Sequence, residues 1–327
     1  MSTQRMKSAL VCLLAATFFL SQPTQAQDLP EPIKDLAPVY DKEPEFVEGL
    51  RAWGKAQIAA AEADIEAARE LDRAKKRDDA KAKATDAKAK IRAVREAYEF
   101  ALKKYEKNAR LHNTYGEILY DHFEDAPGAL REWNTAIDID DKYAPPYNNL
   151  GLDQCHTGSY EIGIQNLEKA LELDPKNPDF MFNIAQIYLV HFPQVEKIKK
   201  WKPKKIYDQA MKLSKKATEL APDDYQLAED YAVNFFAAEN FKVEANWPEA
   251  VAAWQHARGL ATRPDRTFFT WLNEARCLLR DGKPAEAKTR IEEALKIMPD
   301  SPVAKQLLEK ATTPQPAEEK PKKKRGK

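Results

Sequence analysis

The sequence predicts an all-α protein built as a stack of helical hairpins. Three observations predict this class: small residues recur at three helical positions in register, large side chains recur between them, and proline follows the second helix of several hairpins. Two helices approach to about 8–10 Å only where the contacting residues are small, while larger side chains fill the space alongside. An alanine-rich helical protein without repeats could show one such column, but not three in register.

The three columns can be followed along most of the chain. In the first helix of each hairpin the small site holds Gly116, Gly151, Ala185, Ala232 and Ala275. In the second helix the first small site holds Val94, Ala129, Gly163, Ala210, Ala250 and Ala287. The second small site holds Ala101, Ala136, Ala170, Ala217, Ala257 and Ala294. Proline lacks an amide and disfavours helix in the residue before it, so Pro175, Pro222 and Pro299 are expected to end second helices.

The clearest copy of the pattern runs over residues 144–177. It contains Tyr147, Leu150, Gly151, Gly158, Tyr160, Gly163, Leu167, Ala170, Leu171 and Pro175. This spacing resembles the tetratricopeptide repeat (TPR), a helix–turn–helix unit of about 34 residues. The resemblance implies a right-handed superhelix, or α-solenoid, whose concave groove is lined by the first helices.

We expect repeats at 109–143, 144–177, 178–224, 225–267 and 268–301. The third and fourth are longer than the others and are expected to carry insertions, which a stacked fold tolerates as loops or extra helical turns. A capping helix at 302–311 and a disordered basic tail at 312–327 are expected to follow, since the tail has too few apolar residues to fold.

The region before the repeats is expected to have three parts. Residues 1–26 have the basic start, short apolar run and polar end of a secretory signal, with cleavage near Ala26. Residues 27–44 are spaced by prolines and indicate an extended lead-in. Residues 45–108 indicate a long helical hairpin with a TPR-like second helix, either as an N-terminal cap of the stack or as an antiparallel or intermolecular coiled coil.

The signal predicts an exported protein, periplasmic or extracellular, with no transmembrane segment in the mature chain. Its apolar run is shorter than the roughly 20 residues that a membrane helix needs. Cys12 lies too early in this run for a lipoprotein site, which also needs a small residue just before the cysteine. Removing residues 1–26 takes two cations from the 52 Lys and Arg and none of the 52 acidic residues, so the mature charge is 50 − 52 = −2. This balance gives no reason to expect nucleic acid as a partner.

No pattern indicates catalysis, a cofactor or a metal. The glycines form no phosphate-binding motif, and the five histidines form no helical metal pair. Cys155 and His156 are adjacent, but neighbouring residues on a helix point about 100° apart, which disfavours a nucleophile and its base. Cys155 and Cys277 are three repeats apart and are not expected to form a disulfide. We therefore expect a protein that is not an enzyme.

The resemblance implies that a polypeptide partner, of unknown identity, binds the groove in the manner of a scaffold or adaptor. Carried over repeat by repeat, it assigns to the groove Asn113, Asn148, Asn149, Leu152, Phe182, Asn183, Gln186, Val233, Phe236, Asn273 and Arg276. Asn149, Asn183 and Asn273 share one repeat position, where a side-chain amide can donate to and accept from a peptide backbone. Alternatively, asparagine is simply a tolerated polar residue on a solvated face. The cationic clamp that some family members use for a terminal carboxylate is missing, because Asn113, Glu117, Asp179 and Asn183 occupy its positions.

A second hypothesis rests on a basic segment and the basic tail. The segment consists of Lys199, Lys200, Trp201, Lys202 and Lys204, with Lys197 and Lys205 beside them. Cations around an aromatic ring are typical of binding to an anionic polymer or membrane surface. For the tail we expect at most a weak contact with an anionic envelope surface. The simpler interpretation of both is solvated charge.

Overall fold

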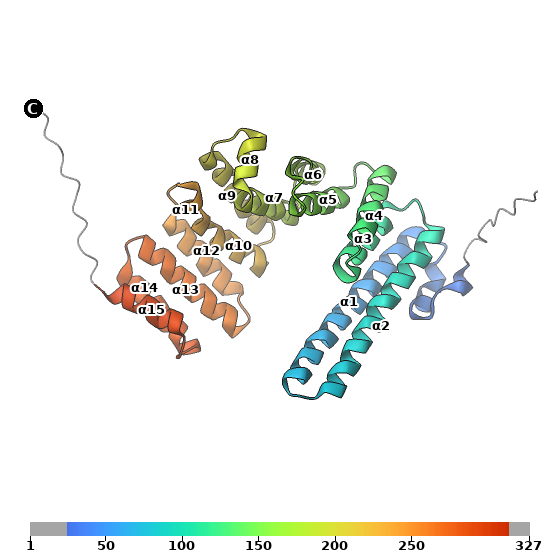
Figure 1. Ribbon diagram of the computed structural model, residues 1–327, viewed down its shortest axis with the longest axis horizontal. Helices are drawn as coiled ribbons and strands as arrows, with labels where there is room; N and C mark the ends of the chain where they lie inside the picture. Colours follow the sequence, from blue (N-terminus) through green and yellow to red (C-terminus); the bar gives the residue numbers. More distant parts are fainter. Residues whose placement is uncertain (1–24, 314–327) are drawn as a thin grey trace, which may run out of the picture. The chain divides into compact units, whose positions relative to one another are not determined.

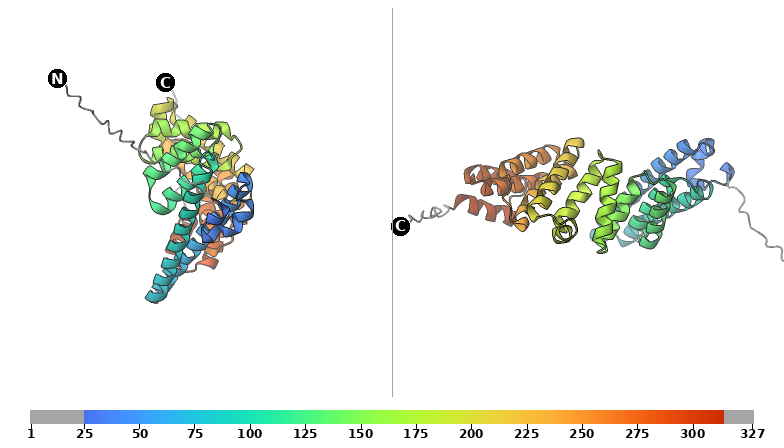
Figure 2. Two further views of the ribbon diagram at one scale, coloured as in Figure 1. Left: turned by 90° about the vertical axis from the view of Figure 1, so that its right-hand side faces the viewer. Right: turned by 90° about the horizontal axis from the view of Figure 1, so that it is seen from above.

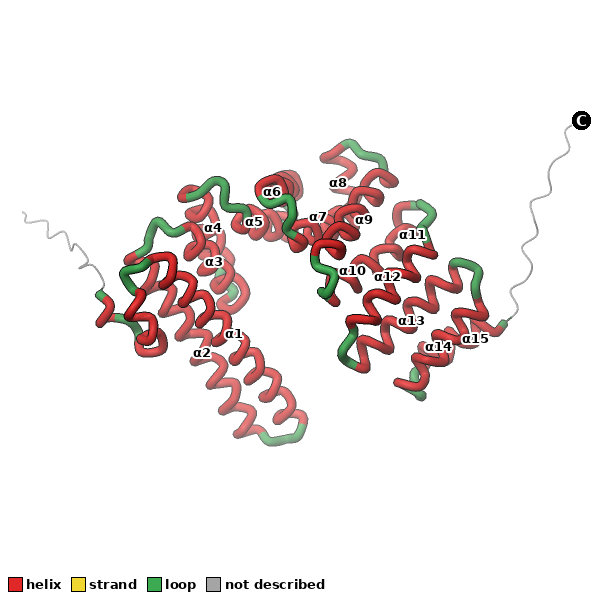
Figure 3. Tube along the Cα trace, turned by 180° about the vertical axis from the view of Figure 1, so that it is seen from behind, coloured by secondary structure: helices red, strands yellow, loops and turns green. Residues whose placement is uncertain are grey.

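The computed structural model describes residues 25–313 and is helical throughout them, with turns between the helices and no strand (Figure 3). The predicted signal at 1–26 and the predicted tail at 312–327 lie almost wholly outside these residues. The chain divides into two compact units, Met1–Ala129 and Leu130–Lys327, and the division falls within helix α4 (Ala126–Ile139). The all-α stack of hairpins predicted from the sequence is confirmed.

The first unit is dominated by a long antiparallel hairpin, α1 (Glu43–Arg73) and α2 (Arg77–Lys104), which Figure 1 shows side by side. Phe46, Leu50, Val94 and Tyr98 are fully buried near the base of the hairpin. Further out, Asp64 of α1 forms ion pairs with Lys83 at 2.8 Å and Lys90 at 2.5 Å. The two helices therefore pack against each other within one chain, and α3 (Ala109–Phe123) packs on α2.

The segment before α1 is not extended, contrary to the prediction for residues 27–44. It forms two 3₁₀ helices, η1 (Ala26–Asp28) and η2 (Glu31–Val39). Leu29 and Ile33 are buried here, and Tyr40 contacts Phe46 edge to face with ring centroids 5.2 Å apart. Proline fixes φ near −65°, a value that suits helical turns as well as extended chain, so burial of these apolar residues decided the conformation.

The second unit continues as a series of helices that follow one another in chain order (Figures 1 and 2). After α4 they are α5 (Pro145–His156), α6 (Tyr160–Leu173), α7 (Pro178–Val190), α8 (Phe192–Lys199), α9 (Pro203–Leu220), α10 (Tyr225–Asn234), α12 (Trp247–Leu260), α13 (Pro264–Arg280), α14 (Pro284–Ile297) and α15 (Pro302–Thr312). Between α10 and α12 lie the short η3 (Phe235–Ala237) and α11 (Ala238–Phe241). Three second helices end two residues before Pro175, Pro222 and Pro299, at Leu173, Leu220 and Ile297.

The predicted columns of small residues lie at the helix contacts. All of their members are buried in the structure. Helices α5 and α6 approach closely, since a Cβ atom added to Gly151 would lie 2.8 Å from the carbonyl oxygen of Gly163. A Cβ atom on Gly163 would lie 2.6 Å from Sγ of Cys155. Two neighbouring backbones can come this close only because both residues lack a side chain.

The two long repeats accommodate their extra residues as helix rather than as open loop. The first contains α8, whose Val195 is fully buried, and the second contains η3 and α11, whose Phe235 and Phe241 are buried. These residues join the largest apolar cluster of the unit, together with Tyr188, Tyr207 and Trp254. The insertions therefore enlarge the core between α7 and α12.

Candidate functional site

The first helices of the second unit, α5, α7, α10 and α13, carry most of the side chains predicted to line a groove. Val233 is exposed, while Asn148 and Asn273 are buried, at 7% and 3% exposure. The remaining predicted residues of this unit are partly exposed: Asn149, Leu152, Phe182, Asn183, Gln186, Phe236 and Arg276. The predicted set is thus a mixture of surface and buried positions.

A pair of amides connects α5 to α7. Asn183 donates from Nδ2 to Oδ1 of Asn148 at 2.9 Å, and Asn148 in turn donates to Oδ1 of Asn149 at 3.3 Å. The three side chains form a polar row across two consecutive repeats, with partly exposed Leu152 and Phe182 on the same two helices. This row has both hydrogen-bond donors and acceptors, which is what an extended peptide backbone requires.

A second polar group connects α7 to α10. Nε2 of Gln186 lies 2.6 Å from both carboxylate oxygens of Asp230, and Asn234 donates to Asp230 Oδ2 at 3.0 Å. Asn234 also donates to Oγ of Ser214, on α9, at 3.1 Å. Burial raises the pKa of Asp230 to about 6, and the bonds from Asn234 and Gln186 only partly oppose this effect. Asp230 stands at the same repeat position as Asn149 and Asn183, a substitution that is visible in the sequence.

Asn273, which was predicted to line the groove, has a buried side chain. Its Nδ2 donates to the Phe269 carbonyl at 3.1 Å, and its Oδ1 accepts from Arg276 at 2.7 Å. The Asn273 side chain is buried and hydrogen-bonded within α13, where it orients Arg276. Of the three asparagines predicted to clasp a peptide, Asn149 and Asn183 are the ones whose side chains are partly exposed.

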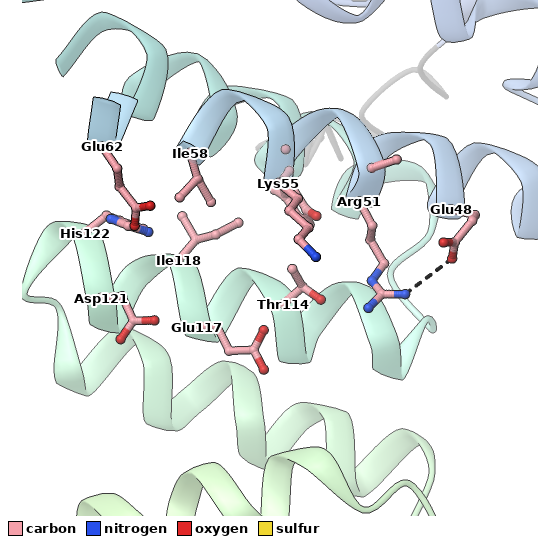
Figure 4. Close-up of a pocket in the computed structure, with 13 residues that line it drawn as sticks. Glu48, Arg51, Lys55, Ile58, Glu62, Thr114, Glu117, Ile118, Asp121 and His122 are labelled. Atoms are coloured by element: carbon pink, nitrogen blue, oxygen red, sulfur yellow. Dashed lines mark hydrogen bonds and ion pairs between the residues drawn. The ribbon is translucent and has the colours of Figure 1, made fainter. Parts of the chain in front are cut away.

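Asn113 lies in the first unit and is buried on α3, where its Nδ2 donates to Glu117 at 2.8 Å. Beside it, α1 and α3 enclose a concavity of about 800 Å³ that the sequence did not reveal. Figure 4 shows Arg51 and Lys55 of α1 facing the helix that carries Glu117 and Asp121. Its walls carry both signs of charge, and this mixture favours no single ligand chemistry.

Several side chains of the predicted basic segment make contacts within the protein. Lys199 forms an ion pair with Glu168 of α6, and Lys204 pairs with Asp208 one turn along α9. Trp201 packs edge to face on Tyr188 with centroids 5.8 Å apart, and the ammonium of Lys205 lies 4.4 Å from the Trp201 ring centre. Lys200 and Lys202 remain exposed. Lys199 and Trp201 therefore connect this segment to α6 and α7, while most of its other lysines stay exposed.

The two cysteines of the described chain are buried and not bonded to each other. Burial raises the pKa of Cys155 to about 11 and that of Cys277 to about 12, so both are protonated thiols at neutral pH. His156 points to solvent. Cys155 instead packs against Gly163 at the α5–α6 crossing, so it contributes to helix packing.

Within residues 25–313, no group of three or more His, Cys, Asp or Glu side chains is arranged to hold a metal ion. Over the same residues, none of the helices combines the length and the apolar character needed to cross a membrane.

Comparison with known proteins identifies the repeat. A family model described as tetratricopeptide repeat matches residues 166–211. The C-terminal part of a TPR-containing protein from Cytophaga hutchinsonii is 19% identical, with a TM-score of 0.50 over 80% of this chain and 99% of that chain. No curated protein sequence matches at a significant level.

Two further solved structures are similar at lower scores. YrrB, described as a TPR protein with an unusual peptide-binding site, is 19% identical, with a TM-score of 0.48 over 65% of this chain and 97% of its own. PilF from Pseudomonas aeruginosa is 16% identical, with a TM-score of 0.47 over 78% of this chain and 99% of its own. The buried columns of small residues, the stacked hairpins and the matched segment lead to one conclusion: this chain is an all-α stack of helical hairpins that contains a tetratricopeptide repeat at residues 166–211.

Proposed function

We propose that the protein is a non-catalytic scaffold that binds another polypeptide along the first helices of its second unit. The observation that carries the proposal is the row Asn148–Asn149–Asn183, which spans two repeats on the same helices as the partly exposed Leu152 and Phe182. Amides offer donors and acceptors to a peptide backbone, and partly exposed apolar side chains gathered on one face are typical of an interaction surface. The row and the apolar side chains together suit an extended segment of a partner chain.

The hydrogen bonds that the amides make to one another are compatible with this function. A neutral intramolecular hydrogen bond contributes only about 0.5–1.5 kcal/mol net, so exchanging it for a bond to a peptide backbone costs little. Until a ligand arrives, the pairs hold the side chains of neighbouring repeats in fixed positions. Such preorganisation reduces the entropy lost on binding.

We propose further that the partner belongs to an exported or envelope-associated complex. The support for this is the secretory pattern of residues 1–26. The alternative of an anionic-polymer binder is weakened by the internal pairing of Lys199 and Lys204, which leaves fewer free cations on that segment.

The test is site-specific photocrosslinking followed by binding measurements. A photoreactive residue replaces Val233, which is exposed on α10, and a control replaces Ile162, which is exposed on the second helix α6. The captured partner is identified, and the purified partner is then titrated against the native protein and two variants, Phe182→Asp and the double variant Asn149→Ala with Asn183→Ala. We expect both variants to bind the partner at least roughly tenfold more weakly than the native protein does, with unchanged circular dichroism. Native affinity in both variants would refute the assignment of this face.

A further inference from the structure

The C-terminal end of the second unit holds a concavity of about 450 Å³. Two of its lining residues, Phe236 and Arg276, were predicted from the sequence to line the peptide groove, but the sequence indicated neither the concavity nor the chemistry of its ligand. The concavity lies between η3, α13 and α15. Phe236, Leu279 and Leu307 supply its apolar walls, and its polar walls come from Arg276, Arg280 and Lys310. Its size is within the range of about 300–1,000 Å³ that ligand sites in proteins occupy.

Both arginines are held in place by other groups. Arg276 donates to the buried amide of Asn273 at 2.7 Å. Arg280 forms an ion pair with Glu239 of α11, and its guanidinium carbon lies 5.0 Å from the Trp247 ring centre and 5.7 Å from that of Phe236. The donors are thus oriented before any ligand binds, which favours recognition of a specific anion geometry.

The positive charges that line this concavity outnumber the carboxylates that pair with them. Arg276 and Arg280 are one turn apart on α13, an arrangement in which like charges destabilise a helix. Within the part of the chain that the structure describes, Glu239 pairs with Arg280, but no carboxylate pairs with Arg276 or Lys310. The surplus of two cations points to an anionic ligand.

The apolar walls restrict which class of anionic ligand fits the concavity. A phosphate or a nucleic-acid backbone would satisfy the cations but leave Phe236, Leu279 and Leu307 without a partner. A peptide whose apolar side chain is flanked by Asp or Glu would match both kinds of wall, because the side chain buries apolar surface while the carboxylates reach Arg276 and Lys310.

We propose that this concavity, called here the terminal pocket, binds an acidic segment of the partner polypeptide through one apolar side chain flanked by Asp or Glu. The proposal rests on the proposed function, since it names the chemistry of the polypeptide that the scaffold takes. The terminal pocket would then fix the position of the partner, while the amide row holds its backbone.

The test uses fluorescein-labelled synthetic peptides and fluorescence anisotropy with the full chain. The probe is an acetylated and amidated peptide with one phenylalanine between two pairs of glutamates. One comparison peptide has glutamine for glutamate, another has alanine for phenylalanine, and a third carries charge only as a free terminal carboxylate. We expect the probe to bind at least about tenfold more tightly than each of the three.

The matched variants are Arg276→Gln with Lys310→Gln, and the control Lys305→Gln, which removes an exposed lysine of α15 that pairs with Asp300. The double variant should lose at least about tenfold in affinity for the probe while the control keeps it. Equal affinity in the double variant would overturn the proposal. Preferential binding of the free-carboxylate peptide, or competition by tripolyphosphate with no dependence on phenylalanine, would overturn it as well.

The two proposals can fail separately. If the double variant still crosslinks to its partner through position 233 but the native protein does not distinguish the peptides, the terminal pocket is refuted and the face of α5 and α7 stands. If the probe binds as expected but Phe182→Asp leaves partner affinity unchanged, the proposed face is refuted and the terminal pocket stands.

Discussion

Glu274 is a fully buried carboxylate on α13. Arg258 forms an ion pair with it, Arg290 donates from Nε at 2.8 Å, and Gln255 donates at 2.9 Å. The ring of Trp271 lies beside both arginines, with its centre 3.6 Å from the guanidinium carbon of Arg258 and 5.6 Å from that of Arg290. This network joins α12, α13 and α14 through one side chain.

Replacing Glu274 by glutamine should lower the free energy of unfolding by about 3 kcal/mol. Removing one member of a buried ion pair typically costs roughly 3–5 kcal/mol because the other charge remains uncompensated, and the partial exposure of both arginines favours the lower end. Urea denaturation measures the change. Glu293→Gln, which breaks a surface pair with Lys296, is the matched control and should cost under about 1 kcal/mol. Similar costs in both variants would contradict the structural importance of Glu274.

Asp230 should make stability depend on pH in an unusual direction. Its pKa is about 6 in the folded protein because of burial, against about 3.9 in an unfolded chain. Between these values the folded state binds more protons than the unfolded state, so this group lowers stability as pH rises from about 4 to about 6. Below that window both states are protonated, and above it both are ionised.

The variant Asp230→Asn should therefore gain stability relative to the native protein as pH increases from 4 to 6.5. The comparison is the difference in urea midpoint between the two proteins at each pH, which cancels the titration of other groups. A difference that stays constant, or that changes in the opposite direction, would show that Asp230 does not titrate in this range.

Sequence patterns singled out Asn273 but not its surroundings, and they did not single out Glu274. Asn273 was predicted to bind a peptide from its repeat position, yet it is buried and bonded to Arg276. Glu274 was not singled out, although it stands in the register otherwise held by Tyr115, Leu150, Ile184 and Tyr231. A charged residue in an apolar column was a readable signal for a buried ion pair. The arginines that complete the pair come from other helices and cannot be chosen from spacing alone.

At the scale of helices, the α5–α6 crossing is a contact at which the repeat pattern requires glycine. The backbones pass so closely at Gly151 and Gly163 that each would clash with a side chain on the other. The sequence predicted small residues at both sites, and the structure shows why glycine rather than alanine is needed in this repeat.

Gly151→Ala and Gly163→Ala should each destabilise the protein by roughly 1–3 kcal/mol, because the added methyl group forces the helices apart. Gly259→Ala on α12 is the control, since nothing lies within 4 Å of its added Cβ atom. Alanine has the higher helix propensity, so the control should be neutral or stabilised by up to about 1 kcal/mol. Thermal denaturation of the three variants distinguishes these outcomes. A Gly151 variant as stable as the control would contradict the packing argument.

At the scale of the whole molecule, stability is distributed unevenly along the repeats. The largest apolar cluster surrounds α7 and α9 in the second unit. In the first unit, by contrast, no residue between Ala61 and Ala80 is buried, so the tip of the α1–α2 hairpin contributes little to any core. In stacked repeats each hairpin contacts mainly its neighbours, and local stability follows local burial.

Hydrogen exchange should reveal this gradient directly. Amides of α7 and α9 should be the slowest to exchange, and those of residues 66–80 should exchange at least about a hundredfold faster because helices opening there expose no core. Mass spectrometry of peptides from a deuterium time course measures both regions in one sample. Uniform protection across them would indicate that the chain unfolds only as one cooperative unit.

The sequence by itself determined the stack of hairpins, because the helix-contact residues must be small and their period along the chain is visible without coordinates. It also predicted two long repeats and showed the likeness to tetratricopeptide repeats. The tertiary structure decided what the sequence left open: α8 and α11 fold into the core, and Asn148 joins Asn183 while Asn273 turns to Arg276. It alone brought Phe236, Arg276 and Lys310 together in the terminal pocket. The physical reason is that packing within a hairpin is local and periodic, whereas a binding surface is made by residues far apart in the chain.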